Sequence, residues 1–296
     1  MTAFRKYESR LVDTVLYGSV AGVLVFFYLP IFALIAFSFR AGKHLVLPFD
    51  GFTVKWYAAL LADPDYLDAA FNSLLIAAVT AVISTIVGTA AVLAVLRLRF
   101  ALRMPLAGLN IAPLVFPQLL LGIVLLLWFS LLGNWTGLSL GIPTVTIGHI
   151  VYITPFAAIV VGVRLTNIDP QLEDAARDCG ASTWAVYRHI TLPLLWPGIF
   201  AAAIFAFLLS WSNFYISFNL AGTAAVLPTY VYAGLAFDSS PLYPALATVS
   251  FIPSIFLVVL AERFRRKAAA VSTDAGALAK KRFTVGSSNA TTESLA

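Results

Sequence analysis

The chain has 296 residues, of which 60% are hydrophobic and 11% are charged. Soluble domains carry about 45–50% apolar and about 25% charged residues, so this composition excludes a soluble protein and indicates a polytopic membrane protein. The net charge of +5 does not by itself predict a nucleic-acid partner, because its distribution along the chain decides its meaning. The single cysteine, Cys179, excludes an intramolecular disulfide and a cysteine-based metal cluster.

Six stretches reach the roughly 20 apolar residues that cross a membrane. They are Val15–Phe39, Phe71–Leu96, Leu106–Leu132, Val145–Val163, Leu194–Leu220 and Pro244–Leu260. Helices are expected, because lipid offers backbone polar groups no partner and no stretch alternates like a barrel strand. The first stretch exceeds the roughly 7–15-residue core of a signal peptide and lacks a cleavage site, so we interpret it as a retained anchor. The predicted fold is an all-α membrane protein with six transmembrane helices.

The basic residues lie mostly on one side of these spans. Sixteen of the 19 lysines and arginines fall in the two terminal segments and in the second and fourth connections. By the positive-inside rule, both termini and these two connections face the cytoplasm. We predict a cytoplasmic tail at 1–14, a transmembrane domain at 15–262, and a basic, disordered cytoplasmic tail at 263–296.

Prolines interrupt two of the predicted spans. Pro113 and Pro117 lie within the third span, and Pro193 and Pro197 open the fifth. Proline removes an intrahelical hydrogen bond and bends a helix, which is tolerated where protein or a cavity satisfies the freed carbonyls. Such bends suit a gated pathway, and they suit helix packing about as well.

The most polar stretch of any predicted span runs from Ser210 to Asn219. Polar groups in a membrane helix face neighbouring helices or a watery path, and the sequence leaves both alternatives open. The candidate path-lining residues are Ser212, Asn213, Tyr215 and Asn219. On one continuous helix, Ser212 and Asn219 would share nearly the same face, with Asn213 turned by about 100°.

Motifs for covalent chemistry are missing or out of context. Residues 42–43, Gly-Lys, lack the upstream glycine of a phosphate-binding loop, so we expect no nucleotide site of that kind in this chain. Residues 137–141 match the string G-x-S-x-G but lie between membrane helices, without the strand-turn-helix context of a nucleophile elbow. The histidines are scattered without metal-ligand spacing: His44, His149 and His189. We expect no catalytic residue, no metal and no cofactor in this chain.

The fourth connection, 169–193, predicts two short helices. The Asp169-Pro170 pair begins the first, with aspartate as the N-cap and proline in the first turn. Gly180 can adopt a positive φ and end this helix. Ser182 then caps a second helix, which ends before Pro193.

The same connection carries a spaced motif. It reads Asp174-Ala175-Ala176, three residues, Gly180, nine residues, and then Ile190, Leu192 and Pro193. This pattern resembles the signature loop of permease subunits of bacterial ABC importers with the type I fold, whose consensus has Glu where this chain has Asp174. The resemblance covers about 71–262. In that family the loop forms a coupling helix that docks in the ATP-binding subunit, which implies this set of coupling residues: Glu173, Asp174, Ala175, Ala176, Gly180, Ile190, Leu192 and Pro193.

The resemblance implies a multi-pass permease of the bacterial inner membrane that forms half of a translocation pathway and has no ATPase site of its own. Implied partners are a second permease in a heterodimer, two ATP-binding subunits that use ATP, a periplasmic solute-binding protein and membrane lipid, with no nucleic acid. The pattern is most similar to the second permease of spermidine/putrescine systems. This similarity suggests a small polar solute such as a polyamine, opine or phosphonate.

Two observations bear on these expectations. Polyamine-type relatives tend to carry adjacent aspartates where this chain has Ser212-Asn213, which argues against a polyamine. The alternative class is an ion-coupled secondary transporter or channel, which usually buries a carboxylate or histidine in a span. Of the ionisable residues here, His149, near a span end, comes closest to that pattern.

Overall fold

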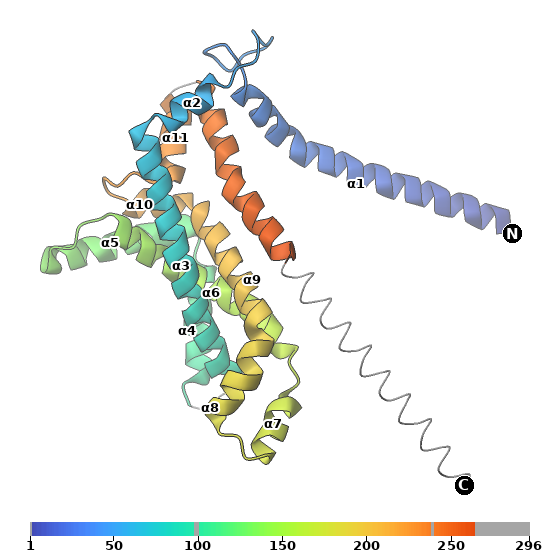
Figure 1. Cartoon of the computed structure of the whole chain (residues 1–296), viewed down its shortest axis with the longest axis vertical. Coiled ribbons are helices and arrows are strands. Elements are labelled where there is room, and N and C mark those ends of the chain that lie inside the picture. The colour runs from blue at the N-terminus through green and yellow to red at the C-terminus, as the bar shows by residue number, and fades with distance from the viewer. Residues whose placement is uncertain (1, 98–100, 238–239, 264–296) are drawn as a thin grey trace. The chain divides into compact units, whose positions relative to one another are not determined.

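The computed structural model is nearly all helical and describes residues 2–97, 101–237 and 240–263, with side chains from residue 12 onward (Figure 1). In these ranges, six helices are long and apolar enough to cross a membrane: Val12–Ser38, Pro64–Arg97, Gln118–Thr136, Ile142–Thr166, Thr183–Trp211 and Leu242–Arg263. The predicted fold class is confirmed. The tail predicted at 263–296 lies outside the described residues apart from Arg263, which belongs to the helix Leu242–Arg263.

The chain divides into two compact units, and unit 1 consists of Met1–Ala69 and Thr229–Ile252. Its helices are α1 (Thr2–Ser38), α2 (Lys55–Leu61), the first turns of α3 (Pro64–Arg97), most of α11 (Leu227–Phe237) and the first half of the helix Leu242–Arg263. The segment expected as an N-terminal tail is therefore helical from Thr2 onward. Between α1 and α2 the chain is folded rather than extended, because Trp56 Nε1 donates to the Arg40 carbonyl at 2.7 Å and Arg40 pairs with Asp50 at 2.8 Å.

The start of α3 is fixed to α11 within unit 1. Asp63 caps α3, since its Oδ1 accepts a hydrogen bond from the Asp65 amide at 3.0 Å. Its other oxygen, Oδ2, accepts from the Tyr230 hydroxyl at 2.6 Å. Burial, together with this bond to a carboxylate, raises the pKa of Tyr230, so the phenol remains a donor at neutral pH.

Unit 2 consists of Ala70–Pro228 and Pro253–Ala296. Its remaining helices are α4 (Arg103–Val115), α5 (Gln118–Thr136), α6 (Ile142–Thr166), α7 (Pro170–Asp178), α8 (Thr183–Val186), the π-helix η1 (Tyr187–Thr191), α9 (Leu192–Trp211) and α10 (Phe214–Leu220). Helix α6 is central, since it packs against α4, α5, α9 and α10. Of the most apolar 18-residue stretch of α6, 50% is buried inside the protein, which is the largest such share among the six candidate spans.

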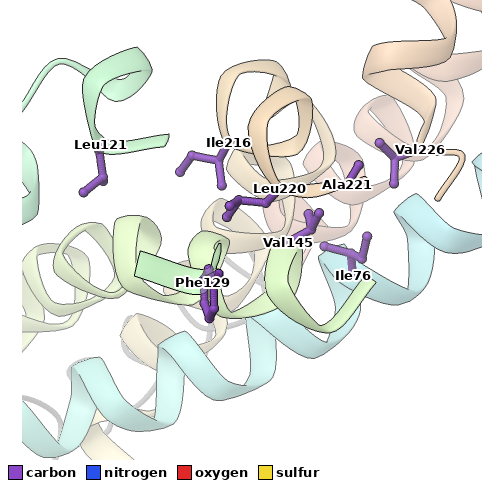
Figure 2. Close-up of a cluster of buried hydrophobic side chains, with 8 residues drawn as sticks. All are labelled: Ile76, Leu121, Phe129, Val145, Ile216, Leu220, Ala221 and Val226. Atoms are coloured by element: carbon purple, nitrogen blue, oxygen red, sulfur yellow. The ribbon is translucent and has the colours of Figure 1, made fainter. Parts of the chain in front are cut away.

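Two of the buried clusters in unit 2 show how its helices pack. Where α6 meets α9, the core contains Val161, Leu165 and Leu195. Figure 2 shows the second cluster, in which Val145 of α6 and Leu220 of α10 lie together with other side chains from α3, α5 and the end of α10. These clusters make α6 the helix around which the rest of unit 2 is arranged.

The predicted third span is wrong as a single helix. It divides into α4 and α5 at Phe116, whose φ of −83° and ψ of 134° are extended. The cause is Pro117, because a residue before proline is disfavoured in the α region. Of these two helices, only α5 is long and apolar enough to cross a membrane.

The predicted fifth span is also not continuous. It ends at Trp211 and resumes as α10 at Phe214, with Ser212 and Asn213 between the two helices. Pro197 lies inside α9 and does not end it. The break falls instead where the Asn213 side chain caps the new helix.

The second helix of the 169–193 connection does not end before Pro193, so that prediction is wrong. The chain runs from Thr183 through η1 into α9 as one 29-residue helical stretch. In η1 the Leu192 amide donates to the Tyr187 carbonyl, five residues earlier, which is the π-helical pattern. This shift in register lies directly before Pro193, which has no amide hydrogen to donate.

Candidate functional site

Helix α7 begins as the sequence predicts. Asp169 is its N-cap, and Asp169 Oδ1 accepts from the Gln171 amide at 2.9 Å. Pro170 occupies the first helical position, where a missing amide hydrogen costs nothing. Glu173 in the first turn and Arg177 in the last have the charges that the helix dipole favours.

The end of α7 is a Schellman turn built on Gly180. Its φ is +87°, which confirms the predicted positive value. The Gly180 amide donates to the Arg177 carbonyl at 2.8 Å, and the Ala181 amide donates to the Ala176 carbonyl at 3.0 Å. These two bonds satisfy carbonyls that the helix end would leave open. Ser182 then caps α8, with its Oγ accepting from the Ala185 amide at 3.3 Å.

The adjacent acids of α7 have different environments. The Glu173 side chain is only 3% exposed and carries two ion pairs, whereas Asp174 is 69% exposed. Arg97 Nε, at the end of α3, lies 3.1 Å from Glu173 Oε1, in an ion pair that is not aligned as a hydrogen bond. Thr191 Oγ1 donates to the same oxygen at 3.1 Å, and Arg177 Nη2 lies 3.5 Å from Oε2.

The remaining motif residues lie in two places, on α7 and at the start of the membrane helix that follows it. Ala175 is exposed beside Asp174, which pairs with Arg177 at 2.7 Å, while Ala176 is partly buried. Cys179, at the C-cap of α7, is exposed. The other three lie in η1 and the start of α9, where Ile190 and Leu192 are partly buried and Pro193 is exposed.

Ser212, Asn213 and Asn219 do not lie on one continuous helix, so the prediction that they share one broad face is wrong. Asn213 is 4% exposed; its Oδ1 accepts from the Ile216 amide at 3.2 Å, and its Nδ2 has no hydrogen-bond partner among the described residues. Asn219 is partly buried and donates to the Tyr215 carbonyl at 2.7 Å. Ser212 and Tyr215 are the two exposed members.

The sequence reading missed a polar connection centred on His149. This histidine of α6 is 1% exposed, with Nδ1 2.8 Å from Ser210 Oγ of α9 and Nε2 3.1 Å from Ser217 Oγ of α10. A neutral imidazole donates from one ring nitrogen and accepts at the other, which suits two hydroxyl partners. The available signal was a histidine inside a predicted membrane span, where ionisable residues are rare and face the interior of the bundle. In the described ranges, no three His, Cys, Asp or Glu side chains gather as metal ligands.

Sequence comparison agrees with this architecture. Residues 86–268 match the family described as binding-protein-dependent transport system inner membrane component. The chain is 31% identical over 250 residues to the spermidine/putrescine transport system permease protein PotC of Escherichia coli K12, covering 84% of this chain and 93% of PotC. It is 35% identical over 228 residues to the putrescine transport system permease protein PotI of the same strain, covering 76% of this chain and 81% of PotI.

Structural comparison supports the same fold. A bacterial ABC transporter involved in the import of the acidic polysaccharide alginate contains a chain that superposes with a TM-score of 0.70 at 18% identity, covering 89% of this chain and 99% of that one. At that identity the similarity shows the fold, while the sequence matches show the family. The chain belongs to the binding-protein-dependent transport system inner-membrane component family and is an inner-membrane permease of an ABC importer.

Proposed function

We propose that this permease receives the movement of partner ATPase subunits through α7. The observation that carries the proposal is the two-sided character of α7: Glu173 fixes one side to the membrane helices, and Asp174 and Ala175 are exposed on another. An alanine lets a partner surface approach the helix backbone closely, and Asp174 offers a charge for a basic partner residue. Two ATP-binding subunits bind and use the nucleotide, and this chain itself binds no cofactor.

The proposed assembly contains this chain, a second and different permease, two ATP-binding subunits and a periplasmic solute-binding protein. Each permease forms half of the translocation pathway, and no covalent chemistry takes place in this chain. Alternating access then needs an element with two arrangements that nucleotide and solute bias from separate sites. Helix α7 is the element in contact with the ATPase subunits.

We propose a small polar solute of the polyamine type, ahead of an opine or a phosphonate. The names of two relatives, PotC and PotI, support this class. Where polyamine-type relatives tend to carry adjacent aspartates, this chain has Ser212, which is exposed, and Asn213, which is buried. The neutral groups open to a solute here are therefore the Ser212 hydroxyl and the partly buried Asn219 amide. Neutral amide and hydroxyl groups hydrogen-bond a passing solute without holding it as a fixed charge would, which favours release over retention.

Cys179 allows one experiment to test both orientation and docking. It is the only cysteine in the sequence and is exposed at the end of α7. With both termini and α7 cytoplasmic, a membrane-impermeant maleimide should label Cys179 in inverted vesicles and not in intact cells. A cysteine in place of Asp50, in a Cys179→Ser background, should label from outside intact cells.

In the same inverted vesicles, co-assembled ATPase subunits should slow the labelling of Cys179 severalfold, because the docked partner covers α7. The control is a vesicle that contains the two permeases without ATPase subunits. Labelling of Cys179 from outside intact cells would contradict the orientation, and equal rates with and without ATPase subunits would contradict docking at α7.

A pair of variants separates the pathway from helix packing in the region around Ser210–Asn219. Tyr215→Ala should lower the maximal uptake rate and leave thermal stability unchanged, because the Tyr215 side chain is 46% exposed and makes no interhelical hydrogen bond among the described residues. His149→Leu should instead lower the free energy of unfolding by about 1–2 kcal/mol, because it removes interhelical bonds worth about 0.6 kcal/mol on average and up to about 1.7 each. Uptake in proteoliposomes and thermal unfolding in detergent measure the two effects. If Tyr215→Ala transports at the wild-type rate, Tyr215 does not line the path.

A further inference from the structure

The Glu173 carboxylate connects three helices of unit 2: α7, α3 and η1. Arg97 is the last described residue of α3, Thr191 is the last residue of η1, and Glu173 lies in the first turn of α7. The Arg97 Nε and Thr191 Oγ1 atoms both lie 3.1 Å from Glu173 Oε1. We name Glu173, Arg97, Thr191 and Arg177 the α7 clamp. Figure 1 shows α7 and α8 at the end of unit 2 where α9 begins.

The burial of Glu173 excludes it from direct contact with a docked partner. Only 3% of its side chain is exposed, and its neighbours are charged or hydroxyl groups that neutralise or solvate the carboxylate. A partner protein could reach it only after α7 separated from η1. Breaking a buried ion pair leaves an uncompensated charge, so that separation is strongly disfavoured. The expectation that Glu173 shares the partner contact with Asp174 therefore does not fit its place in the fold.

A second contact extends the clamp into the turn before α7. Arg97 Nη2 donates to the Ile168 carbonyl at 3.4 Å. Ile168 is itself 6% exposed and belongs to the core cluster that contains Leu165 and Leu195. Arg97 thus fixes the turn before α7, as well as the helix itself, to a packed core.

Glu173 and Asp174 therefore have different roles. We propose that Glu173 is a positioning residue that couples α7 rigidly to the ends of α3 and α9, so that a displacement of α7 moves both membrane helices. This inference rests on the proposed function, in which α7 receives the movement of the ATPase subunits. Asp174 contacts the partner, and Glu173 passes the displacement inward.

The test uses the complete importer reconstituted in proteoliposomes, and it measures solute uptake per ATP hydrolysed. Glu173→Gln preserves the shape of the side chain and an oxygen for Thr191, but removes the charge that holds Arg97. Uptake per ATP should fall about fivefold or more, the lower end of typical coupling effects, while the ATPase subunits still co-purify. Asp68→Asn is the matched control, since Asp68 is an exposed carboxylate in an early turn of α3, and it should leave the ratio unchanged.

Thr191→Val provides a milder second variant in case Glu173→Gln fails to assemble. It removes one hydrogen bond to the clamp without burying an unpaired charge, and it should lower uptake per ATP by a smaller factor. A purely structural role would reduce the amount of assembled importer while leaving the ratio of uptake to hydrolysis at the wild-type value. That outcome in either assembled variant overturns the inference.

Two measurements, protection of Cys179 and uptake per ATP, distinguish failure of this inference from failure of the proposed function. If ATPase subunits protect Cys179 but the clamp variants keep the wild-type ratio, α7 is the docking element and Glu173 is not its positioning residue. If the subunits do not protect Cys179, docking at α7 is itself wrong, and the inference about Glu173 falls with it.

Discussion

Gly180→Val is expected to reduce solute uptake by at least about tenfold. Gly180 has a φ of +87°, and the left-handed region costs an L-residue roughly 1–2 kcal/mol, with a β-branched side chain at the unfavourable end. A penalty of about 1.4 kcal/mol already corresponds to a tenfold change in a conformational equilibrium. The chain relieves it by losing the two hydrogen bonds that close α7, which misplaces the docking helix. Uptake in proteoliposomes, normalised to the amount of importer, measures the effect.

The strain at Gly180 can be separated from side-chain volume. Among the described residues, apart from the two neighbours in the chain, no heavy atom lies within 4 Å of the position that a Cβ would occupy there, so a clash does not explain a loss of activity. Gly180→Asn is the matched control, because asparagine tolerates the left-handed region better than other non-glycine residues. It should retain most of the uptake. Normal uptake by a well-assembled Gly180→Val importer would show that the end of α7 does not determine coupling.

Gly88→Leu is expected to prevent stable folding of the permease. A Cβ at Gly88 would lie 2.8 Å from the Ala158 amide nitrogen and 3.1 Å from the Thr154 carbonyl oxygen of α6. Backbone atoms cannot rotate aside, so α3 and α6 have to separate, and overpacking of this kind costs about 1–3 kcal/mol or more. Close approach through small residues is a main source of helix association in membranes, which makes the loss severe.

Yield of monodisperse protein and thermal unfolding in detergent measure this effect. The controls are Gly22→Leu and Gly108→Leu, since neither glycine has an atom within 4 Å of its Cβ position. Both should behave like the wild type, and Gly88→Ala should be intermediate. A Gly88→Leu protein with wild-type thermal stability would contradict the close packing of α3 on α6.

The local signals in the sequence predicted α7 well, and its boundaries show why. Asp169, Pro170 and Gly180 act on backbone groups within a few residues of themselves, so their effect depends little on the rest of the fold. The number of membrane helices was predictable for a similar reason. Lipid imposes a minimum apolar length on every span, whatever its neighbours are.

Proline was a less reliable guide to helix ends. Pro117 ends α4, where the sequence had predicted only a bend within one span, because the residue before it is extended. Pro193 and Pro197 instead lie within the stretch that includes α9, and the π-helical turn of η1 changes the hydrogen-bond register just before Pro193. The actual break, at Ser212 and Asn213, contains no proline. There, a side-chain cap and the burial of α10 against its neighbours outweigh the continuity of an apolar helix.

The sequence by itself determined the class of protein, the number of spans, the family motif and the caps of α7, because these depend on apolar length and on contacts within a few residues. The tertiary structure alone decided that Glu173 is buried and Asp174 exposed, and that His149 joins α6 to α9 and α10. Two adjacent acids have nearly the same chemistry, and a histidine has no local signature of its partners. Their roles are set by Arg97, Thr191, Ser210 and Ser217, which only the packing of distant helices brings within hydrogen-bonding or ion-pairing distance.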